Sequence, residues 1–320
     1  MPYVIHGANG LLAKFEKEQK KIARQDIESS DEEIDEEEQR IKIEKENKDV
    51  IILNEKDAKA LISKLSDGSW IVKSVDEKPR TSNPKPPFTT STLQQEAARK
   101  LRFSAKNTMR VAQQLYENGF ITYMRTDSTH LSKEAINGSR NLISKLFGND
   151  YLPKSPNNYE TNVKNAQEAH EAIRPAHKLF KSVETVQKKL GKDAGSLYDL
   201  IWKRTIASQM LPAKLKQTAV VISNSKTDFR ASGQIIVFPG YMKIYVEGKD
   251  NPDAELANKE KLLPNLTKND QLSCLNILAQ KHNTKPPARF TEASLIKEME
   301  TNGIGRPSTF ASILDTIVRR

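Results

Sequence analysis

Apolar residues recur at helical spacing through the middle of the chain. The clearest stripe lies in residues 194–210, where apolar side chains follow one another at three- and four-residue intervals. Ser104 and Gly119 bracket another helix, since Ser favours the N-cap and Gly favours the position after the last turn. Further helices are predicted after a capping box at Thr92-x-x-Gln95, over Ser132–Phe147 and over Ser182–Leu190.

Strand-like alternation lies on both sides of this helical region. A short helix, Asp57–Leu65, is predicted before the strand Trp70–Val75, and the pattern returns to strands after Pro212. The last predicted helix runs into Arg320 without a stop signal, so we interpret this end as cut rather than finished. The later predicted elements are the strands Thr218–Ser223, Ile235–Phe238, Tyr241–Val246 and Gln271–Leu278 and the helices Glu292–Thr301 and Ser308–Arg320.

Proline-rich connectors separate these regions. Residues 79–87 contain four prolines and are not expected to continue a helix or a central strand, and Pro286-Pro287 marks a second connector. The fold class predicted is α+β and multidomain, with a helical domain inserted into a mainly β domain and a truncated helical segment at the C-terminus. The predicted boundaries are 1–82 and 211–282 for the two β-rich parts, 83–210 for the helical domain and 283–320 for the last segment.

Charge is unevenly distributed along the 320 residues. The first 50 residues hold 9 basic and 14 acidic side chains, whereas the other 270 hold 42 and 27, a net charge of +15. The run Asp31–Glu38, seven acidic residues in eight, is predicted to be a solvated insertion or mobile loop. A basic body favours a polyanionic partner, most simply nucleic acid, although charge alone equally allows an inert basic surface.

Composition excludes several classes of protein. With 37% hydrophobic residues the chain is not expected to be wholly disordered, and no apolar run reaches the ~20 residues that a membrane-spanning helix needs. The N-terminus lacks the basic and apolar regions of a signal peptide. Cys274 is the only cysteine, which excludes an internal disulfide and a cysteine zinc site and fits a reducing compartment.

Tyr123 is the strongest candidate for chemistry. It lies in Thr122-Tyr123-Met124-Arg125-Thr126-Asp127-Ser128, a segment dense in hydrogen-bond donors. A phenol with a pKa of about 10 is a weak nucleophile at neutral pH, but a nearby guanidinium favours the phenolate and stabilises a phosphoryl group under attack. Tyr123 with Arg125 is therefore a credible nucleophile and stabiliser, and an ordinary Tyr at a strand end is the alternative.

His170 carries less information when read alone. The segment His170–Arg174 differs from a zincin helix because Arg174 stands where the second His is required. His170 and His177 without a third ligand make a poor zinc site, so no metal ligands are predicted. Without further context His170 is interpreted as structural or capping. Arg306, at a predicted helix start after two glycines, is expected to contact phosphate.

Four segments resemble the type IA DNA topoisomerases, in particular the bacterial enzymes. They occur in the order typical of that family and extend over residues 88–313, whereas residues 1–80 resemble the family only loosely. The segments are FTTSTLQQEA at 88–97, GFITYMRTDS at 119–128, AQEAHEAIRP at 166–175 and GIGRPSTFASI at 303–313.

The resemblance implies a mechanism and a set of roles. Tyr123 matches the nucleophile, which attacks one DNA strand and becomes joined to its 5′ phosphate, so that negative supercoils relax and the strand is resealed without ATP. Arg125 matches the arginine expected to bind the scissile phosphate, and His170 matches the histidine of the active site. Positions associated with DNA contact or active-site support are matched by Gln113, Glu117, Thr122, Asp127, Arg174, Arg306 and Thr309.

The same resemblance sets expectations about cofactor and partners. The family's Mg²⁺ is bound mainly by an acidic Toprim domain, for which these residues show no counterpart, and no zinc ribbons follow. The chain is therefore expected to be a central fragment that forms the opening arch, acts on single-stranded DNA, needs a Toprim domain in cis or in trans and is inactive alone. A monomer in the cytoplasm, associated with the nucleoid and not with a membrane, is expected. The alternative is a catalytically incomplete module that only binds single-stranded DNA.

Overall fold

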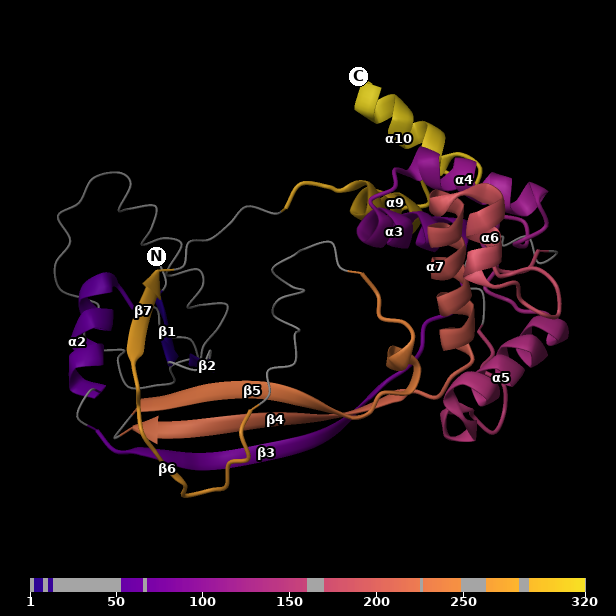
Figure 1. Ribbon diagram of the computed structural model, residues 1–320. Coiled ribbons are helices and arrows are strands. Elements are labelled where there is room, and N and C mark those ends of the chain that lie inside the picture. The colour runs from indigo at the N-terminus through magenta and orange to yellow at the C-terminus, as the bar shows by residue number, and fades with distance from the viewer. Residues whose placement is uncertain are drawn as a thin grey trace. The chain divides into compact units, whose positions relative to one another are not determined.

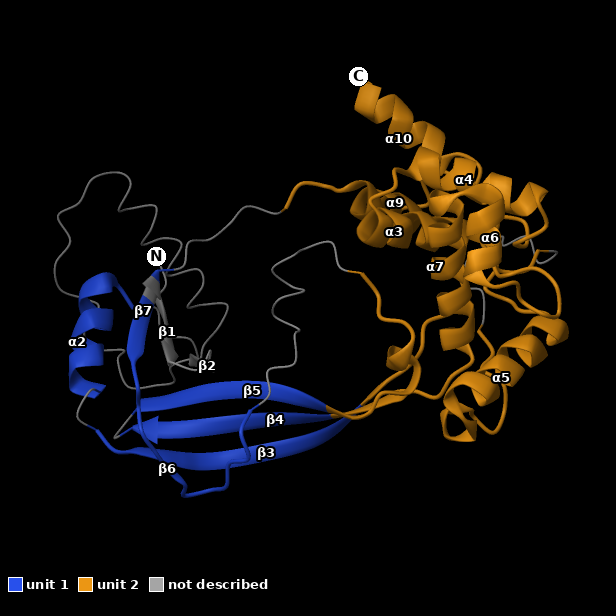
Figure 2. Ribbon diagram, viewed as in Figure 1, with its two compact units in different colours: residues 1–80, 216–235, 260–287 blue, residues 81–215, 236–259, 288–320 orange. Residues whose placement is uncertain are grey.

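The computed structural model divides the chain into two compact units, each with its own core (Figures 1 and 2). Unit 1 comprises residues 1–80, 216–235 and 260–287, and unit 2 comprises 81–215, 236–259 and 288–320. Helices combine with antiparallel strand pairs, so the α+β class is confirmed, whereas the division at residues 82, 210 and 282 stays a prediction. The residues described are 3–7, 11–13, 53–65, 68–159, 170–224, 227–248, 263–281 and 288–319.

The described residues of unit 1 form two small sheets and one helix. In the first sheet, β1 (Tyr3–Gly7) lies between β2 (Leu11–Ala13) and β7 (Ile277–Lys281), with Ile5 opposite Ala279. The second sheet has the order β5-β4-β3-β6. Its strands are β3 (Trp70–Ser82), β4 (Ala213–Asn224), β5 (Thr227–Phe238) and β6 (Gln271–Leu272), of which β3, β4 and β5 extend a few residues into unit 2.

Helix α2 (Glu55–Leu65) supplies much of the apolar core of unit 1. Its buried face, Ala58, Leu61 and Leu65, belongs to one cluster with buried residues of β3, β4 and β5. The helix starts two residues before the predicted start. Asn54 fixes that start because its side-chain oxygen accepts from the Asp57 N–H at 2.9 Å.

Pro79 corrects the expectation that residues 79–87 form a connector. The strand β3 continues through Pro79 to Ser82. The described pairing of β3 with β6 covers only Trp70 and Ile71, so on that side β3 is a sheet edge at Pro79. An edge position tolerates proline because no neighbouring strand there requires its missing N–H.

Two strand predictions in the second half were wrong. Residues 240–243 form the 3₁₀ turn η2 (Gly240–Lys243), which places Tyr241 and Tyr245 four residues apart on one buried side. The predicted strand Gln271–Leu278 is broken, because β6 pairs with β3 in one sheet whereas β7 pairs with β1 in the other. Apolar alternation in sequence does not reveal such a change of partner.

Unit 2 is built mainly from helices, and most of the predicted ones are confirmed within two residues. Ser104, Ser132 and Ser182 are N-caps, each accepting a backbone N–H three residues on. The helices are α3 (Thr90–Leu101), α4 (Ala105–Glu117), α5 (Lys133–Phe147), α6 (Val183–Leu190), α7 (Lys192–Ser208), α9 (Glu292–Thr301) and α10 (Phe310–Arg319), with the 3₁₀ turn η1 (Asn149–Tyr151) after α5.

Helix α7 lies at the centre of the unit 2 core. It packs against α3, α4, α5 and α6, and Leu197, Tyr198, Ile201 and Ile206 are fully buried. The helices α9 and α10 pack instead on α3 and α4 through a separate small cluster that includes Ala105, Ile296 and Phe310. Residues 288–319 therefore pack with the helical unit and are not a unit of their own.

The capping box of α3 lies one turn earlier than predicted. Thr89 is the N-cap, and Thr89 and Thr92 each bond the other's backbone N–H through their hydroxyls. Each of residues 89–92 carries a hydroxyl, and tertiary contacts determine at which of them α3 begins. Thr90 Oγ1 donates to the carbonyl oxygens of Met124 and Thr126 at 2.8 and 3.0 Å.

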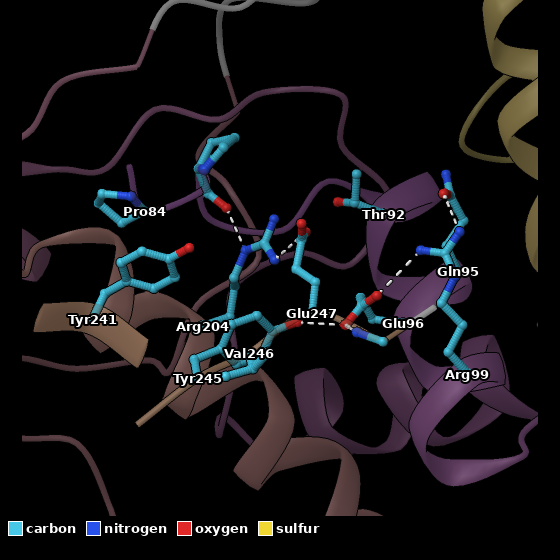
Figure 3. Close-up of polar contacts among 12 residues, drawn as sticks. Pro84, Thr92, Gln95, Glu96, Arg99, Arg204, Tyr241, Tyr245, Val246 and Glu247 are labelled. Atoms are coloured by element: carbon cyan, nitrogen blue, oxygen red, sulfur yellow. Dashed lines mark hydrogen bonds and ion pairs between the residues drawn. The ribbon is translucent and has the colours of Figure 1, made fainter. Parts of the chain in front are cut away.

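A buried ionic network lies beside α3 and α7 (Figure 3). The carboxylate of Glu96, 2% exposed, accepts from the Tyr245 hydroxyl at 2.7 Å and the Gly248 N–H at 3.0 Å. Arg204, 3% exposed, donates to Pro86 O at 2.6 Å and Glu247 at 2.8 Å. Burial lowers the pKa of Lys100, which contacts the same carboxylate.

Several predictions concern residues outside those the structure describes, including the acidic run 31–38, Pro286-Pro287 and residues 166–169. Among the described residues, no helix combines the length and the apolar character needed to cross a lipid bilayer.

Candidate active site

A tight helix end brings Tyr123 back beside α4. Gly119 has φ +72° and its N–H donates to Tyr116 O at 2.8 Å, while the Phe120 N–H donates to Leu115 O at 2.9 Å. This pair of bonds is the Schellman motif, and the accompanying contact between Leu115 and Phe120 places both side chains in the main core. The chain therefore reverses directly after α4.

The backbone on either side of Tyr123 is held in place. The Thr122 N–H donates to Arg174 O at 2.9 Å, and the Thr122 hydroxyl donates to Ala172 O at 2.7 Å. On the other side Thr90 holds Met124 O and accepts the Thr126 N–H at 2.8 Å. Tyr123 is consequently left with little freedom other than its own side-chain torsions.

The ring of Tyr123 has an aromatic neighbour from each of two chain segments. Tyr116 of α4 lies edge-on with ring centroids 5.3 Å apart, and His170 lies at 5.8 Å with a 34° angle between the ring planes. Tyr123 is nevertheless 37% exposed. The phenol is thus ordered by its neighbours and still accessible to a large substrate.

Arg125 and Asp127 follow Tyr123 on a self-bonded turn. Thr126 and Ser128 are buried, and the Ser128 N–H donates to Thr126 Oγ1 at 3.0 Å. Arg125 is exposed and Asp127 is half-buried. The turn therefore uses two of its hydroxyls internally and presents the guanidinium close to the nucleophile candidate in sequence.

His170 lies on an extended segment that pairs with the loop before Tyr123. The segment forms single bridges with Phe88 and Ile121, and the Ala172 N–H donates to His130 O at 2.8 Å. Because these bonds fix residues 172–176, they also set where His170 enters the site.

Arg174 is a buried charged residue beside the Tyr123 loop. It is only 7% exposed, and its guanidinium donates to Glu171 Oε2 at 2.6 Å, Pro175 O at 2.9 Å and Ser132 Oγ at 3.3 Å. These bonds make Arg174 a support of the loop, and its contact with DNA stays a prediction. Burial opposes ionisation of Glu171, but bonds from Arg174 and Ser132 lower the pKa of this carboxyl.

Gln113 and Glu117 lie next to Tyr116 on the exposed side of the last turn of α4. The Gln113 side-chain amide donates to Glu117 Oε1 at 2.8 Å. Residues 113, 116 and 117 share one helix face, so this pair lies close to Tyr123 by way of Tyr116.

Arg306 and Thr309 lie in another part of unit 2, at the turn between α9 and α10. The Arg306 N–H donates to Thr309 Oγ1 at 2.8 Å and the guanidinium to Gly305 O at 2.8 Å. Arg306 is exposed and lies four residues before Phe310, the first residue of α10, whose N–H donates to Arg306 O at 3.1 Å. Its described bonds are local to this turn.

Sequence reasoning missed Tyr116, Thr90 and the pair Ser132–Glu171. The Ser132 N–H donates to Glu171 Oε1 at 2.6 Å, which ties the start of α5 to the His170 segment. The hydroxyl residues 89–92 and the helix stop at Gly119 are visible in the sequence. The bonds of Thr90 to Met124 and Thr126 are not, because these partners lie more than 30 residues away, and the contact of Tyr116 with Tyr123 depends on packing.

The described residues do not form a metal centre. Among them, no three His, Cys, Asp or Glu side chains come close enough together to hold a metal ion. The described ring neighbours of Tyr123 are the phenol of Tyr116 and the imidazole of His170.

Comparison with known sequences identifies the family. The profile of the DNA topoisomerase family matches residues 11–320, and the chain belongs to that family. DNA topoisomerase 1 of Synechococcus elongatus is 54% identical over 271 residues, covering 85% of this chain and 30% of that protein. DNA topoisomerase 1 of Streptomyces coelicolor is 51% identical over 273 residues, covering 84% and 28%. The chain thus spans about 30% of the length of these relatives.

A solved structure gives the same result. Full-length topoisomerase I from Thermotoga maritima superimposes with a TM-score of 0.70 and 32% identity, over 99% of this chain and 46% of that one. The fold of the described residues is therefore similar to a substantial part of a topoisomerase I.

Proposed function

We propose that this chain is the tyrosine-bearing part of a type IA DNA topoisomerase. The observation that carries the proposal is the placement of Tyr123, which is 37% exposed while its backbone is held on both sides and its ring contacts both Tyr116 and His170. A fixed, accessible nucleophile is what attack on a DNA strand requires.

In the proposed reaction one DNA strand is exchanged onto the protein and back. The Tyr123 oxygen forms a bond to phosphorus and gives up its proton, while the bond to the 3′ oxygen breaks and that oxygen takes a proton. The strand remains joined to Tyr123 through its 5′ phosphate. Resealing reverses both changes and therefore uses no ATP, and negative supercoils relax in between.

Arg125 and His170 are proposed to act on the phosphate. The exposed guanidinium of Arg125 lies two residues from Tyr123 and offsets the negative charge of a phosphate under attack. His170 contacts the nucleophile's ring and hydrogen-bonds the same phosphate. Thr122 and Arg174 support the loop, and DNA contacts are proposed for Gln113, Glu117, Asp127, Arg306 and Thr309.

Single-stranded DNA is the proposed partner. Its support is the net charge of +15 over residues 51–320, together with exposed Arg125 and Arg306. Mg²⁺ is proposed to be held by an acidic Toprim domain in the part of the longer relatives that this chain does not span. A monomer that acts in the cytoplasm on nucleoid DNA completes the proposal.

The architecture supports an inserted helical domain. Strand β3 before the helices and strands β4 and β5 after them share one sheet. We therefore propose that residues 83–210 are inserted between two halves of a sheet domain, 1–82 and 211–282, as in an arch that opens to pass a strand.

The test is a chimera in which this chain replaces the matching segment of the Synechococcus elongatus relative. A labelled single-stranded oligonucleotide is incubated with chimera and Mg²⁺ and analysed on a denaturing gel. We expect a covalent adduct at its 5′ phosphate that disappears with Tyr123→Phe, while oligonucleotide binding is retained. The 320-residue chain alone should give no adduct and no relaxation.

Each outcome discriminates between readings. An adduct that survives Tyr123→Phe would exclude this nucleophile, and a robust adduct from the chain alone would exclude dependence on other parts. If the chimera binds the oligonucleotide but forms no adduct whereas the parent relative does, the alternative of a binding-only remnant is favoured.

A further inference from the structure

We infer that Tyr116 is a positioning residue that orients the phenol of Tyr123 for attack. The inference rests on the proposed function and adds a residue to which the resemblance gives no role. It concerns the two adjacent aromatic rings at the end of α4, not the phosphate contacts.

The first step is the location of Tyr116. It lies in the last turn of α4, 42% exposed, next to fully buried Leu115. Its own carbonyl accepts the Gly119 N–H in the turn that reverses the chain. The same turn that ends the helix therefore also brings Tyr123 into contact with the side chain of Tyr116.

The second step is the freedom that remains to Tyr123. Bonds to Thr122 and Met124 hold the backbone on both sides. An exposed tyrosine whose backbone is fixed still samples those staggered χ1 rotamers that its backbone allows, and contacts to its ring select among them. Those contacts are Tyr116 at 5.3 Å from one segment and His170 at 5.8 Å from another.

The third step separates positioning from simple packing. Leu115 and Phe120 supply the apolar contacts that hold the end of α4 in the core, whereas Tyr116 is not among the core residues. Removing its ring should leave the fold intact and release only the Tyr123 side chain. The hydroxyl of Tyr116 has no part in an edge-on ring contact, so phenylalanine should replace it.

The experiment compares Tyr116→Ala, Tyr116→Phe and a control in the chimera. Leu146→Ala is the control because Leu146 is also a large exposed side chain, 52%, in the last turn of a helix. From the strength of aromatic pairs we expect Tyr116→Ala to slow single-turnover adduct formation about three- to tenfold. Its oligonucleotide Kd should be unchanged, and Tyr116→Phe and Leu146→Ala should match the parent.

A second measurement uses the 320-residue chain without any activity. With isotope-labelled tyrosine, the Hα–Hβ couplings of Tyr123 report its χ1 rotamer by NMR. We expect one dominant rotamer in the parent chain and in Tyr116→Phe, and averaged couplings in Tyr116→Ala. This measurement stands even if the chimera forms no adduct, so failure of the proposed function and failure of this inference are distinguishable.

Three results would overturn the inference. Unchanged couplings in Tyr116→Ala would show that Tyr116 does not restrict Tyr123. Slow cleavage that Tyr116→Phe fails to restore would assign the effect to the hydroxyl. A higher Kd for the oligonucleotide in Tyr116→Ala, with an unchanged cleavage rate, would indicate instead that a DNA base stacks on the Tyr116 ring.

Discussion

Thr122 and Arg174 hydrogen-bond each other in both directions, once between backbone atoms and once through the Thr122 hydroxyl. The Thr122 N–H donates to Arg174 O at 2.9 Å, and the Arg174 N–H donates to Thr122 Oγ1 at 3.0 Å. The same hydroxyl donates to Ala172 O at 2.7 Å. Thr122, the residue next to the proposed nucleophile, therefore connects the Tyr123 loop to the His170 segment by hydrogen bonds that it both donates and accepts.

Thr122→Val should destabilise unit 2 because it removes the hydroxyl that makes these bonds. Valine keeps the shape of the side chain, so packing changes little. The Arg174 N–H and the Ala172 carbonyl would lose their partner, and an unsatisfied buried group costs about 1–3 kcal/mol. Thr122→Ser, which keeps the hydroxyl, is the matched control. The midpoint of urea unfolding measures both, and equal midpoints for Val and parent would contradict the prediction.

Gly119→Ala should also destabilise the site. At φ +72° an added Cβ meets only the His177 side chain at 3.9 Å, so space is available and the backbone conformation is the obstacle. A left-handed conformation costs a residue with a Cβ about 1–2 kcal/mol. Gly119→Asn should cost less, because Asn tolerates this conformation better. Thermal unfolding of the three proteins checks the order Gly, Asn, Ala.

The lowered pKa of Glu171 predicts that the free energy of unfolding falls at acid pH. Its pKa is lower in the folded chain than its ordinary value of 4.5, so the folded state binds fewer protons. The stabilisation is fully present above that ordinary value and is lost as pH falls through the folded pKa. Glu171→Gln should flatten the dependence of unfolding free energy on pH below 5, and in an Arg174→Met background the same change should have a smaller effect.

Binding of single-stranded DNA should weaken steeply with salt. Neutralised phosphates release counterions, and each contact contributes about 0.7 to the slope of log affinity against log salt for single strands. Arg125→Gln and Arg306→Gln should each reduce that slope by about this amount, whereas Lys64→Gln on α2 should not. Fluorescence anisotropy at several salt concentrations measures the slopes, and a salt-independent affinity of the parent would refute the electrostatic interpretation.

What the sequence predicted well was local. The stops at Gly119 and Gly148 and the serine caps depend on residues a few positions apart, and the structure confirms the helix ends that they define. Burial of Arg174 was not predictable in this way, because its partners Ser132 and Glu171 meet only when α5 has packed on the His170 segment.

Sheet partners were the other limit. Pro79 was predicted to belong to a connector, yet β3 continues through it. The described pairing of β3 with β6 ends at Ile71, so no described β6 residue needs an N–H from Pro79. Residues Gln271–Leu278 were predicted as one strand, although they contribute to two strands in two sheets. Alternation of apolar residues records that one face is buried, and it carries no information on which strand lies alongside.

The guanidinium of Arg204 holds two stretches of chain that are far apart in sequence. One is Pro86, just after the chain first enters unit 2, and the other is Glu247, before it leaves that unit near residue 259. Arg204 belongs to α7, so both stretches are attached directly to the central helix of the unit 2 core. Replacing Arg204 would therefore release both stretches from α7 at once, because one buried side chain anchors the two of them.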